Sequence, residues 1–260
     1  MAPQWIARAV TSAVLALAVT GCGAAGGGTE RSGHGTKTVT VFAASSLSGA
    51  LEEARSAFAK AHPSLKIRLN MGGSSTLVAQ LRNGAPADLF ASADETTMDK
   101  AVDAGLTDGS VRLFAGNTLS LLVQKGNPQK ISGLRDLNRE GLTVSLCGPQ
   151  VPAGRYARQA LRSAGVPVPR GGEELDVKQV ASRVTLGEAD VGIVYTTDAK
   201  AVAGKADEVA IAEDHNVVAH YPASVLKTGD NAAGAKVFLD FLLSLEGRQI
   251  LKKHGFREPR

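Results

Sequence analysis

The chain has 260 residues, of which 43% are hydrophobic and 21% are charged, and its formal net charge is +4. This composition is ordinary for a soluble globular protein, and the length allows one or two substantial cores. Lysine and arginine residues are scattered among acidic ones, without a basic stripe or interleaved aromatic residues, so nucleic acid is not expected as a partner.

The first residues have the pattern of a secretory signal. Arg8 is the only charge before the apolar run Ala9–Val19, and small residues follow that run. The run is shorter than the roughly 20 residues that a membrane-spanning helix needs, so we interpret residues 1–21 as a signal peptide. The sequence VTGC ending at Cys22 resembles the bacterial lipobox, whose cysteine becomes acylated. We therefore expect an extracytoplasmic protein that Cys22 anchors to the cell membrane.

The Gly-rich residues 22–36 are typical of a flexible tether. With Cys22 acylated, only Cys147 remains, so no intrachain disulfide is expected in the mature protein. We interpret Cys147 as a small buried hydrophobic residue. The histidines lack the spacing of metal ligands, since the closest pair, His215 and His220, has no cysteine nearby. No site for a bare metal cation is therefore predicted.

From Lys37 onward, segments with strand patterns alternate with segments of helical periodicity. Strands are predicted at Val39–Phe42, Ile67–Met71 and Asp88–Ala91, and the helical patterns after them end at Ala61, at Asn83-Gly84 and at Gly105. This βαβαβα order predicts an α/β fold with a mostly parallel sheet and helices on both faces.

A second block of alternating elements starts at Asn117. Strands are predicted at Leu119–Gln124, Val144–Cys147, Val191–Tyr195 and in VVAHYPASVL, and helices in VPAGRYARQALRSAG, over Val177–Leu186 and in one last helix through Ala235–Leu245. These patterns predict two lobes with a ligand in the cleft between them. The first lobe is assigned residues 37–117, with residues 217–260 returning to it, and the second lobe residues 118–216.

Two of the predicted strand-to-helix turns contain paired serines with no charge nearby. The first is FAASSL, with Ser46, and the second is GGSSTL, with Ser74. The first N–H groups of a helix lack partners and favour an anion, and a serine hydroxyl adds a donor. Gly72-Gly73 allows close approach of the main chain. The alternative is that both serines are ordinary helix N-caps.

Two further segments supply hydrogen-bond donors of the same kind. VPAG, at Val151–Gly154, forms a helix entry with free N–H groups. Tyr195 ends a predicted strand, and its hydroxyl either points over the cleft or lies satisfied in the core. Together these turns predict a pocket of neutral hydrogen-bond donors that suits an anion.

FAASSL, GGSSTLVAQL, GAPADLFASAD, VPAGRYA and GIVYTTDA occur in the order found in the periplasmic molybdate-binding proteins. The resemblance covers about Val39 to Phe256. It implies the two-lobed type II periplasmic binding protein fold and a monomer without cofactor or catalysis. The implied function is to capture molybdate, with tungstate as a second ligand, and to deliver it to the membrane permease of an ABC importer.

The resemblance also implies which residues contact the oxyanion, so that molybdenum is bound as an oxyanion and not as a cation. Carried over position by position, the contacts are the hydroxyls of Ser46, Ser74 and Tyr195 and the backbone N–H groups of Ala153 and Val177. Ser45, where the family usually has alanine, and Ser75 are expected to support them. The family often has an acidic residue ahead of VPAG, where this chain has CGPQ.

Three other readings compete with this one. A surface adhesion or scaffolding lipoprotein of the same fold would be suggested by loss of the donors at Ser46, Ser74 and Tyr195, and all three are present. Ser224-x-x-Lys227 and the KTG that starts at Lys227 match motifs of penicillin-interacting serine enzymes, but one lysine cannot fill both roles, so no enzyme is predicted. A binding protein of the same fold for sulfate, phosphate or a small organic acid is the stronger alternative. An organic acid would usually bring an arginine into the motif turns. Arg155 follows VPAG, and its helical position is expected to turn it outward.

Overall fold

The structure is a computed structural model that describes residues 37–259. The predicted signal peptide, the tether and Cys22 lie outside the described residues. No helix within residues 37–259 is both long enough and apolar enough to cross a membrane.

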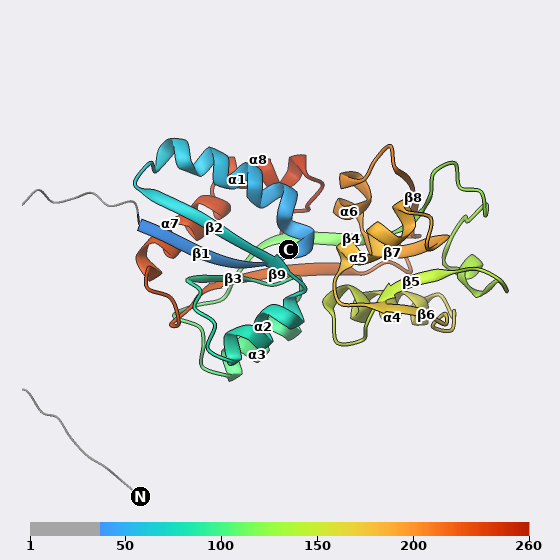
Figure 1. Ribbon diagram of the computed structural model, residues 1–260, viewed down its shortest axis with the longest axis horizontal. Helices are drawn as coiled ribbons and strands as arrows, with labels where there is room; N and C mark the ends of the chain where they lie inside the picture. Colours follow the sequence, from blue (N-terminus) through green and yellow to red (C-terminus); the bar gives the residue numbers. More distant parts are fainter. Residues whose placement is uncertain (1–36, 260) are drawn as a thin grey trace, which may run out of the picture. The chain divides into compact units, whose positions relative to one another are not determined.

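Within residues 37–259, nine strands form one sheet in the order β2-β1-β3-β9-β4-β7-β5-β6, and β8 pairs with β4 (Figure 1). Their bounds are β1 (Lys37–Ala44), β2 (Leu65–Gly72), β3 (Leu89–Ala91), β4 (Arg112–Gln124), β5 (Val144–Cys147), β6 (Gly171–Glu174), β7 (Val191–Tyr195), β8 (Ala206–Ala210) and β9 (Val218–Val225).

The same range holds eight α-helices and two short 3-10 helices. Their bounds are η1 (Ser45–Leu47), α1 (Ser48–Ala61), α2 (Ser74–Arg82), α3 (Glu95–Asp103), η2 (Leu134–Asn138), α4 (Pro152–Ser163), α5 (Val177–Thr185), α6 (Thr196–Ala201), α7 (Ala232–Leu243) and α8 (Leu245–Lys253). The predicted last helix is two helices, because the Ser244 hydroxyl accepts from the Gly247 N–H and starts α8. Two strands were not predicted from the sequence: β6, whose sequence is GGEE, and the half-exposed β8.

The sheet is mixed. At one end β1 pairs in parallel with β2 and β3, and at the other β5 pairs in parallel with β6 and β7. Between them β4 and β9 run antiparallel to each other. The long strand β4 pairs with β9 over Arg112–Thr118 and with β7 over Leu119–Val123, so one strand belongs to both halves of the sheet. The sequence predicted β4 only from Leu119.

The helices cover both faces of each half of the sheet. In Figure 1, α1 and α8 lie on one face of β1–β3, and α2 and α3 lie on the other. Buried apolar side chains fill the space between the layers. The main core cluster extends through both halves, whereas a smaller one, around Phe42, Phe90 and Met98, lies beneath α2 and α3. The packed layers position the turns that follow the strands.

Candidate functional site

Turns from both halves of the sheet line one pocket. The turns after β1 and β2 contribute Ser46 and Ser74, the starts of α4 and α5 contribute Ala153 and Val177, and the end of β7 contributes Tyr195. The structure therefore brings together all five residues that the sequence pointed to. The other lining residues are Ala44, Ser45, Gly72, Gly73, Ala93, Val151, Pro152 and Asp176.

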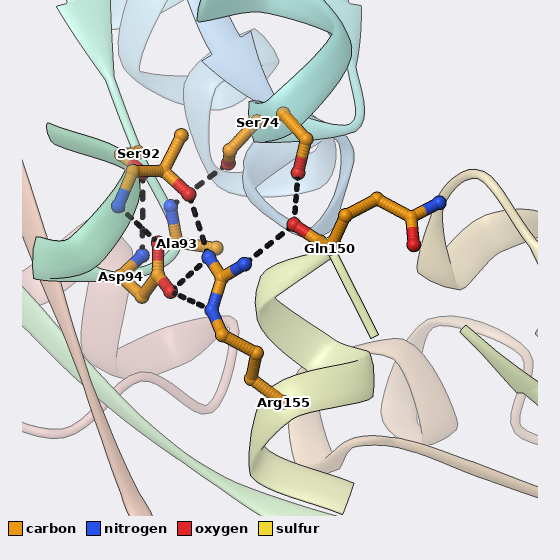
Figure 2. A network of polar contacts seen from close by, with 8 residues as sticks. Ser74, Ser92, Ala93, Asp94, Gln150 and Arg155 are labelled. Carbon is orange, nitrogen blue, oxygen red and sulfur yellow. Dashed lines mark hydrogen bonds and ion pairs between the residues drawn. The ribbon is translucent and has the colours of Figure 1, made fainter. Parts of the chain in front are cut away.

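Ser45 lines this pocket, but Ser75 does not. The Ser75 hydroxyl donates to the backbone carbonyl of Gln150 at 2.6 Å. Gln150 lies just before α4, so this hydrogen bond joins the start of α2 to the opposite side of the pocket (Figure 2). Ser75 therefore supports the site as a link between its two sides and not as a lining donor.

Close backbone approach explains the glycines around the pocket. A Cβ on Gly73 would lie 2.3 Å from the carbonyl oxygen of Leu175, which belongs to the opposite side of the pocket. A Cβ on Gly154 would lie 2.0 Å from the carbonyl oxygen of Gly148. Real Cβ atoms do not approach backbone oxygens so closely, so glycine is required at both positions by the fit of the turns and not by their φ angles.

The two pocket serines are not N-caps. The N-cap of α2 is Gly73 and that of η1 is Ala44, and neither end has a side-chain cap. Ser74 is thus the first helical residue of α2, and its hydroxyl oxygen accepts a hydrogen bond from the Ala93 N–H at 3.0 Å. The Ser46 hydroxyl lies 3.0 Å from that of Tyr221. The structure therefore rules out the N-cap alternative for both serines.

The helices on the other side also present N–H groups. Pro152 is the first residue of α4, so Ala153 carries the first N–H of that helix, and no side chain caps it. At α5 the Asp176 carboxylate accepts from the N–H groups of Lys178 and Gln179, and this leaves the Val177 N–H outside the cap. Both N–H groups lie in the first turn of a helix, where they favour an anion.

Tyr195 supplies a buried donor with no partner. Its side chain is 1% exposed, and among the described residues its hydroxyl has no hydrogen-bond partner. Burial raises the pKa of this phenol well above its ordinary value, so the group stays protonated and can donate. A buried polar group without a partner is unusual, and the lining of this pocket is where Tyr195 can find one.

From the sequence, Arg155 was expected to point outward, but in the structure its side chain contacts Asp94. Its Nε donates to Asp94 Oδ2 at 2.9 Å, a terminal nitrogen of the guanidinium pairs with the same oxygen, and that nitrogen also donates to Thr97 Oγ1 at 2.7 Å. Figure 2 shows this network, in which Arg155 also donates to the Gln150 carbonyl. Arg155 thereby ties α4 to the β3–α3 turn, and its charge is balanced by Asp94.

The charge around the pocket is therefore small. Among the described lining residues there is no lysine or arginine, and the one carboxylate, Asp176, is engaged in capping α5. The sequence did not predict the roles of Ala93, Asp94 and Asp176. Asp94 and Asp176 each stand three residues before a residue whose N–H needs a cap, and this pattern signals helix starts. It does not indicate that Asp94 pairs with Arg155 or that Asp176 lines the pocket.

Other features of the sequence have structural explanations. Cys147 is buried and free, which confirms its interpretation as a small core residue, and burial raises its pKa. Ser224 is fully buried and its hydroxyl donates to the Val225 carbonyl, so the apparent serine-enzyme motif holds no exposed nucleophile. Within residues 37–259 no group of three or more His, Cys, Asp or Glu side chains could hold a metal ion.

Known proteins resemble this chain in sequence and in structure. The molybdate-binding protein ModA of Mycobacterium tuberculosis is 37% identical over 98% of this chain and 100% of its own length. ModA of Escherichia coli is 34% identical over 98% and 99%. The solved periplasmic molybdate-binding protein of Azotobacter vinelandii has a TM-score of 0.76 and 26% identity, and the match covers 85% of this chain and 100% of that one.

The sulfate-binding protein SubI of Mycobacterium tuberculosis has the same TM-score of 0.76 at 19% identity, over 85% of this chain and 87% of that chain, which shows a shared fold alone. These structural neighbours confirm the type II periplasmic binding protein fold. Each of these relatives is named as a binding protein. Residues 39–257 match the family described as bacterial extracellular solute-binding protein, and the chain belongs to that family.

Proposed function

We propose that this protein captures molybdate in the pocket between Ser46, Ser74, Ala153, Val177 and Tyr195. The observation that carries the proposal is the convergence of neutral donors from both halves of the sheet on one pocket that Tyr195 also lines, with a buried hydroxyl that has no partner among the described residues. The two ModA relatives, each matched over almost its whole length, support molybdate as the ligand.

Neutral donors are sufficient for a dianion if they are numerous and fixed. A bare charge in a dry pocket loses hydration worth tens of kcal/mol by a Born estimate. Each hydrogen bond to a charged group contributes about 1.5–3 kcal/mol net, and each helix start adds about 0.3–1 kcal/mol. Because Arg155 is paired with Asp94 and the described lining residues include no lysine or arginine, no cation of the lining would slow the release of the anion.

Selectivity among dianions would come from the size of the pocket, since charge is the same for molybdate, tungstate and sulfate. A smaller ion leaves some donors without an acceptor, and each unpaired buried donor costs about 1–3 kcal/mol. We accordingly propose tungstate as a second ligand and sulfate as a poor one. Phosphate and small organic acids are the alternatives that the binding experiment would reveal.

We further propose the assembly in which this pocket works. Cys22 anchors the protein by a lipid to the outer side of the cell membrane, and a monomer delivers the anion to the permease of an ABC importer. Lobe 1 comprises residues 37–117 and 217–260, lobe 2 comprises residues 118–216, and the two close around the anion by hinge motion. A relative from Bacillus subtilis, named a putative ABC transporter substrate-binding lipoprotein and 34% identical over 84% of this chain, supports the anchor and the importer.

Calorimetric titration of the full chain carrying Cys22→Ser, which prevents acylation, tests the ligand. Molybdate and tungstate should bind one to one, with sulfate and phosphate at least about a hundredfold weaker. Ser74→Ala and Tyr195→Phe should each lower molybdate affinity by about tenfold or more, because each removes a hydrogen bond to a charged ligand. Ser56→Ala is the control, since this exposed hydroxyl donates only to the Glu52 carbonyl of its own helix.

Tyr195→Phe has a second expected property. Because the Tyr195 hydroxyl is buried without a partner within residues 37–259, its removal should not lower the melting temperature of the ligand-free protein. Preference for sulfate or phosphate, or full molybdate affinity in both site variants, would contradict the proposed function.

A further inference from the structure

A buried pair of polar side chains lies behind Ser46, outside the pocket lining. Tyr221, on β9, is fully buried, and its hydroxyl lies 3.0 Å from that of Ser46. Asn117, on β4, is also fully buried, and its Nδ2 lies 3.4 Å from the Tyr221 hydroxyl. Neither residue belongs to the pocket lining, yet together they determine which way the Ser46 hydroxyl can point.

The orientation of the Asn117 amide is fixed by the backbone. Its other amide atom lies 2.9 Å from the Thr118 N–H, and because that N–H can only donate, this atom must be the oxygen. The nitrogen then donates to Thr197 Oγ1 at 2.9 Å and faces the Tyr221 hydroxyl. An amide nitrogen offers hydrogens and no acceptor, so the Tyr221 hydroxyl cannot donate toward Asn117.

The hydroxyl hydrogen of Tyr221 therefore has one acceptor within reach among the described residues, the Ser46 oxygen. A fully buried donor is expected to find an acceptor, and burial raises the pKa of Tyr221, so the hydrogen is present. If Tyr221 donates to Ser46, the hydrogen of Ser46 cannot point back at Tyr221. It is left free to point into the pocket that Ser46 lines.

The Ser74 hydroxyl is oriented in the same way by a different donor. Its oxygen accepts from the Ala93 N–H at 3.0 Å, and a backbone N–H can only donate. The hydrogen of Ser74 is therefore also free to point into the pocket. The two serines enter from different strand ends, but each is held by a donor behind it, so each is set to donate forward.

We propose that Tyr221 and Asn117 are positioning residues that fix the Ser46 hydroxyl as a donor to the bound oxyanion. This inference rests on the proposed function and deepens it, because it explains how a rotatable hydroxyl acts as a pre-oriented donor. Without Tyr221, the Ser46 hydroxyl must give up its rotational freedom when the anion binds. Neither Tyr221 nor Asn117 touches the anion.

A double-mutant cycle distinguishes this role from a structural one. Molybdate affinity is measured by calorimetry for the Cys22→Ser chain and for the same chain with Tyr221→Phe, with Ser46→Ala and with both. We expect Tyr221→Phe to weaken binding about three- to tenfold when Ser46 is present, as is typical for one hydrogen bond. In the Ser46→Ala background the same change should weaken binding less than about twofold, because its target is gone.

Asn117→Asp provides a second variant with the shape of asparagine and the oxygen that Thr118 needs. Its second oxygen is an acceptor, so it draws the Tyr221 hydrogen away from Ser46. Asn117→Asp should again weaken molybdate binding. This loss should be larger when Ser46 is present than in the Ser46→Ala background, where only the added charge can act. Tyr156→Phe is the matched control, since it also removes a phenol hydroxyl from a half-buried side chain, and this hydroxyl is not hydrogen-bonded to Ser46 or Ser74.

A loss from Tyr221→Phe that is equal in both backgrounds would show a general structural role and would overturn the inference, as would no loss with Ser46 present. If Tyr221→Phe does not fold, the Asn117→Asp comparison decides. If the Cys22→Ser chain binds no oxyanion at all, the proposed function fails and this inference fails with it. Molybdate binding by the Cys22→Ser chain, together with a loss from Tyr221→Phe that depends on Ser46, supports the proposed function and this inference.

Discussion

The ion pair between Arg155 and Asp94 predicts a measurable link between stability and ligand release. Arg155→Met keeps most of the side-chain stem and removes the guanidinium. The Asp94 side chain is 3% exposed and that of Arg155 is 25% exposed, so the change leaves a buried carboxylate with its Thr97 N–H contact but without its cation. Breaking such a pair costs about 3 kcal/mol, the lower end of the range for buried pairs, because Arg155 is partly in water.

For a chain of this size, 1 kcal/mol shifts the melting temperature by about 2–4 °C, so a loss of about 3 kcal/mol corresponds to roughly 6–12 °C. Scanning calorimetry of the ligand-free variant measures that shift. The pair also joins α4 to the β3–α3 turn across the pocket, so molybdate should dissociate faster from the variant in stopped-flow experiments, while its association rate changes little.

Lys236→Met is the control, since the Lys236–Asp240 pair is exposed, with side chains 72% and 54% accessible, and is worth about 0–1 kcal/mol. Asp94→Asn combined with Arg155→Met should recover part of the lost stability, because it removes the uncompensated charge. If Arg155→Met melts at the same temperature as Lys236→Met and releases molybdate at the wild-type rate, the pair does not hold the two sides of the pocket together.

Two further predictions follow from close packing and from burial. Gly73→Ala places a Cβ against the Leu175 carbonyl on the other side of the pocket, at a cost of about 1–3 kcal/mol. Molybdate affinity should therefore fall about tenfold in calorimetric titration. Gly133→Ala is the control, because its Cβ meets open space and the variant should bind molybdate normally. Burial raises the pKa of the Asp198 carboxyl to about 7, and Lys178 offsets this only in part. The folded protein then holds a proton that the unfolded chain has released, so the free energy of unfolding should fall as pH rises from about 4 to 7. Asp198→Asn should flatten that slope in urea titrations at pH 5 and pH 7.5, and an unchanged slope would contradict the assignment.

The sequence predicted the local elements well where one face of an element is apolar. The strands at Val39–Phe42 and Val191–Tyr195 and the helix that begins at Val177 are present, because burial imposes a period of two or 3.6 on such segments. It failed where that signal is weak. β6, with the sequence GGEE, has no apolar side chain and is held by its backbone ladder to β5, so no hydrophobic pattern could indicate it.

The pairing of β4 could not be predicted from local pattern. The strand spans Arg112–Gln124 and changes partners from β9 to β7 between Thr118 and Leu119. The local sequence does not indicate which strands pair with β4, because strand pairing depends on long-range packing. The same holds for Arg155. Its helical position was clear, but its contact with Asp94 depends on how closely α4 approaches the β3–α3 turn.

The sequence by itself determined the chemistry of the candidate site: serines, helix starts and a tyrosine without a cation, in motifs whose order resembles one family. Only the tertiary structure decided how those groups act together. It showed that Ser46 and Ser74 are not N-caps, that the buried Tyr195 hydroxyl has no partner in the described part of the chain, and that the Tyr221 hydroxyl contacts Ser46. The physical reason is that residue type sets whether a group can donate, whereas the direction in which a hydroxyl donates depends on neighbours that lie far away in the chain.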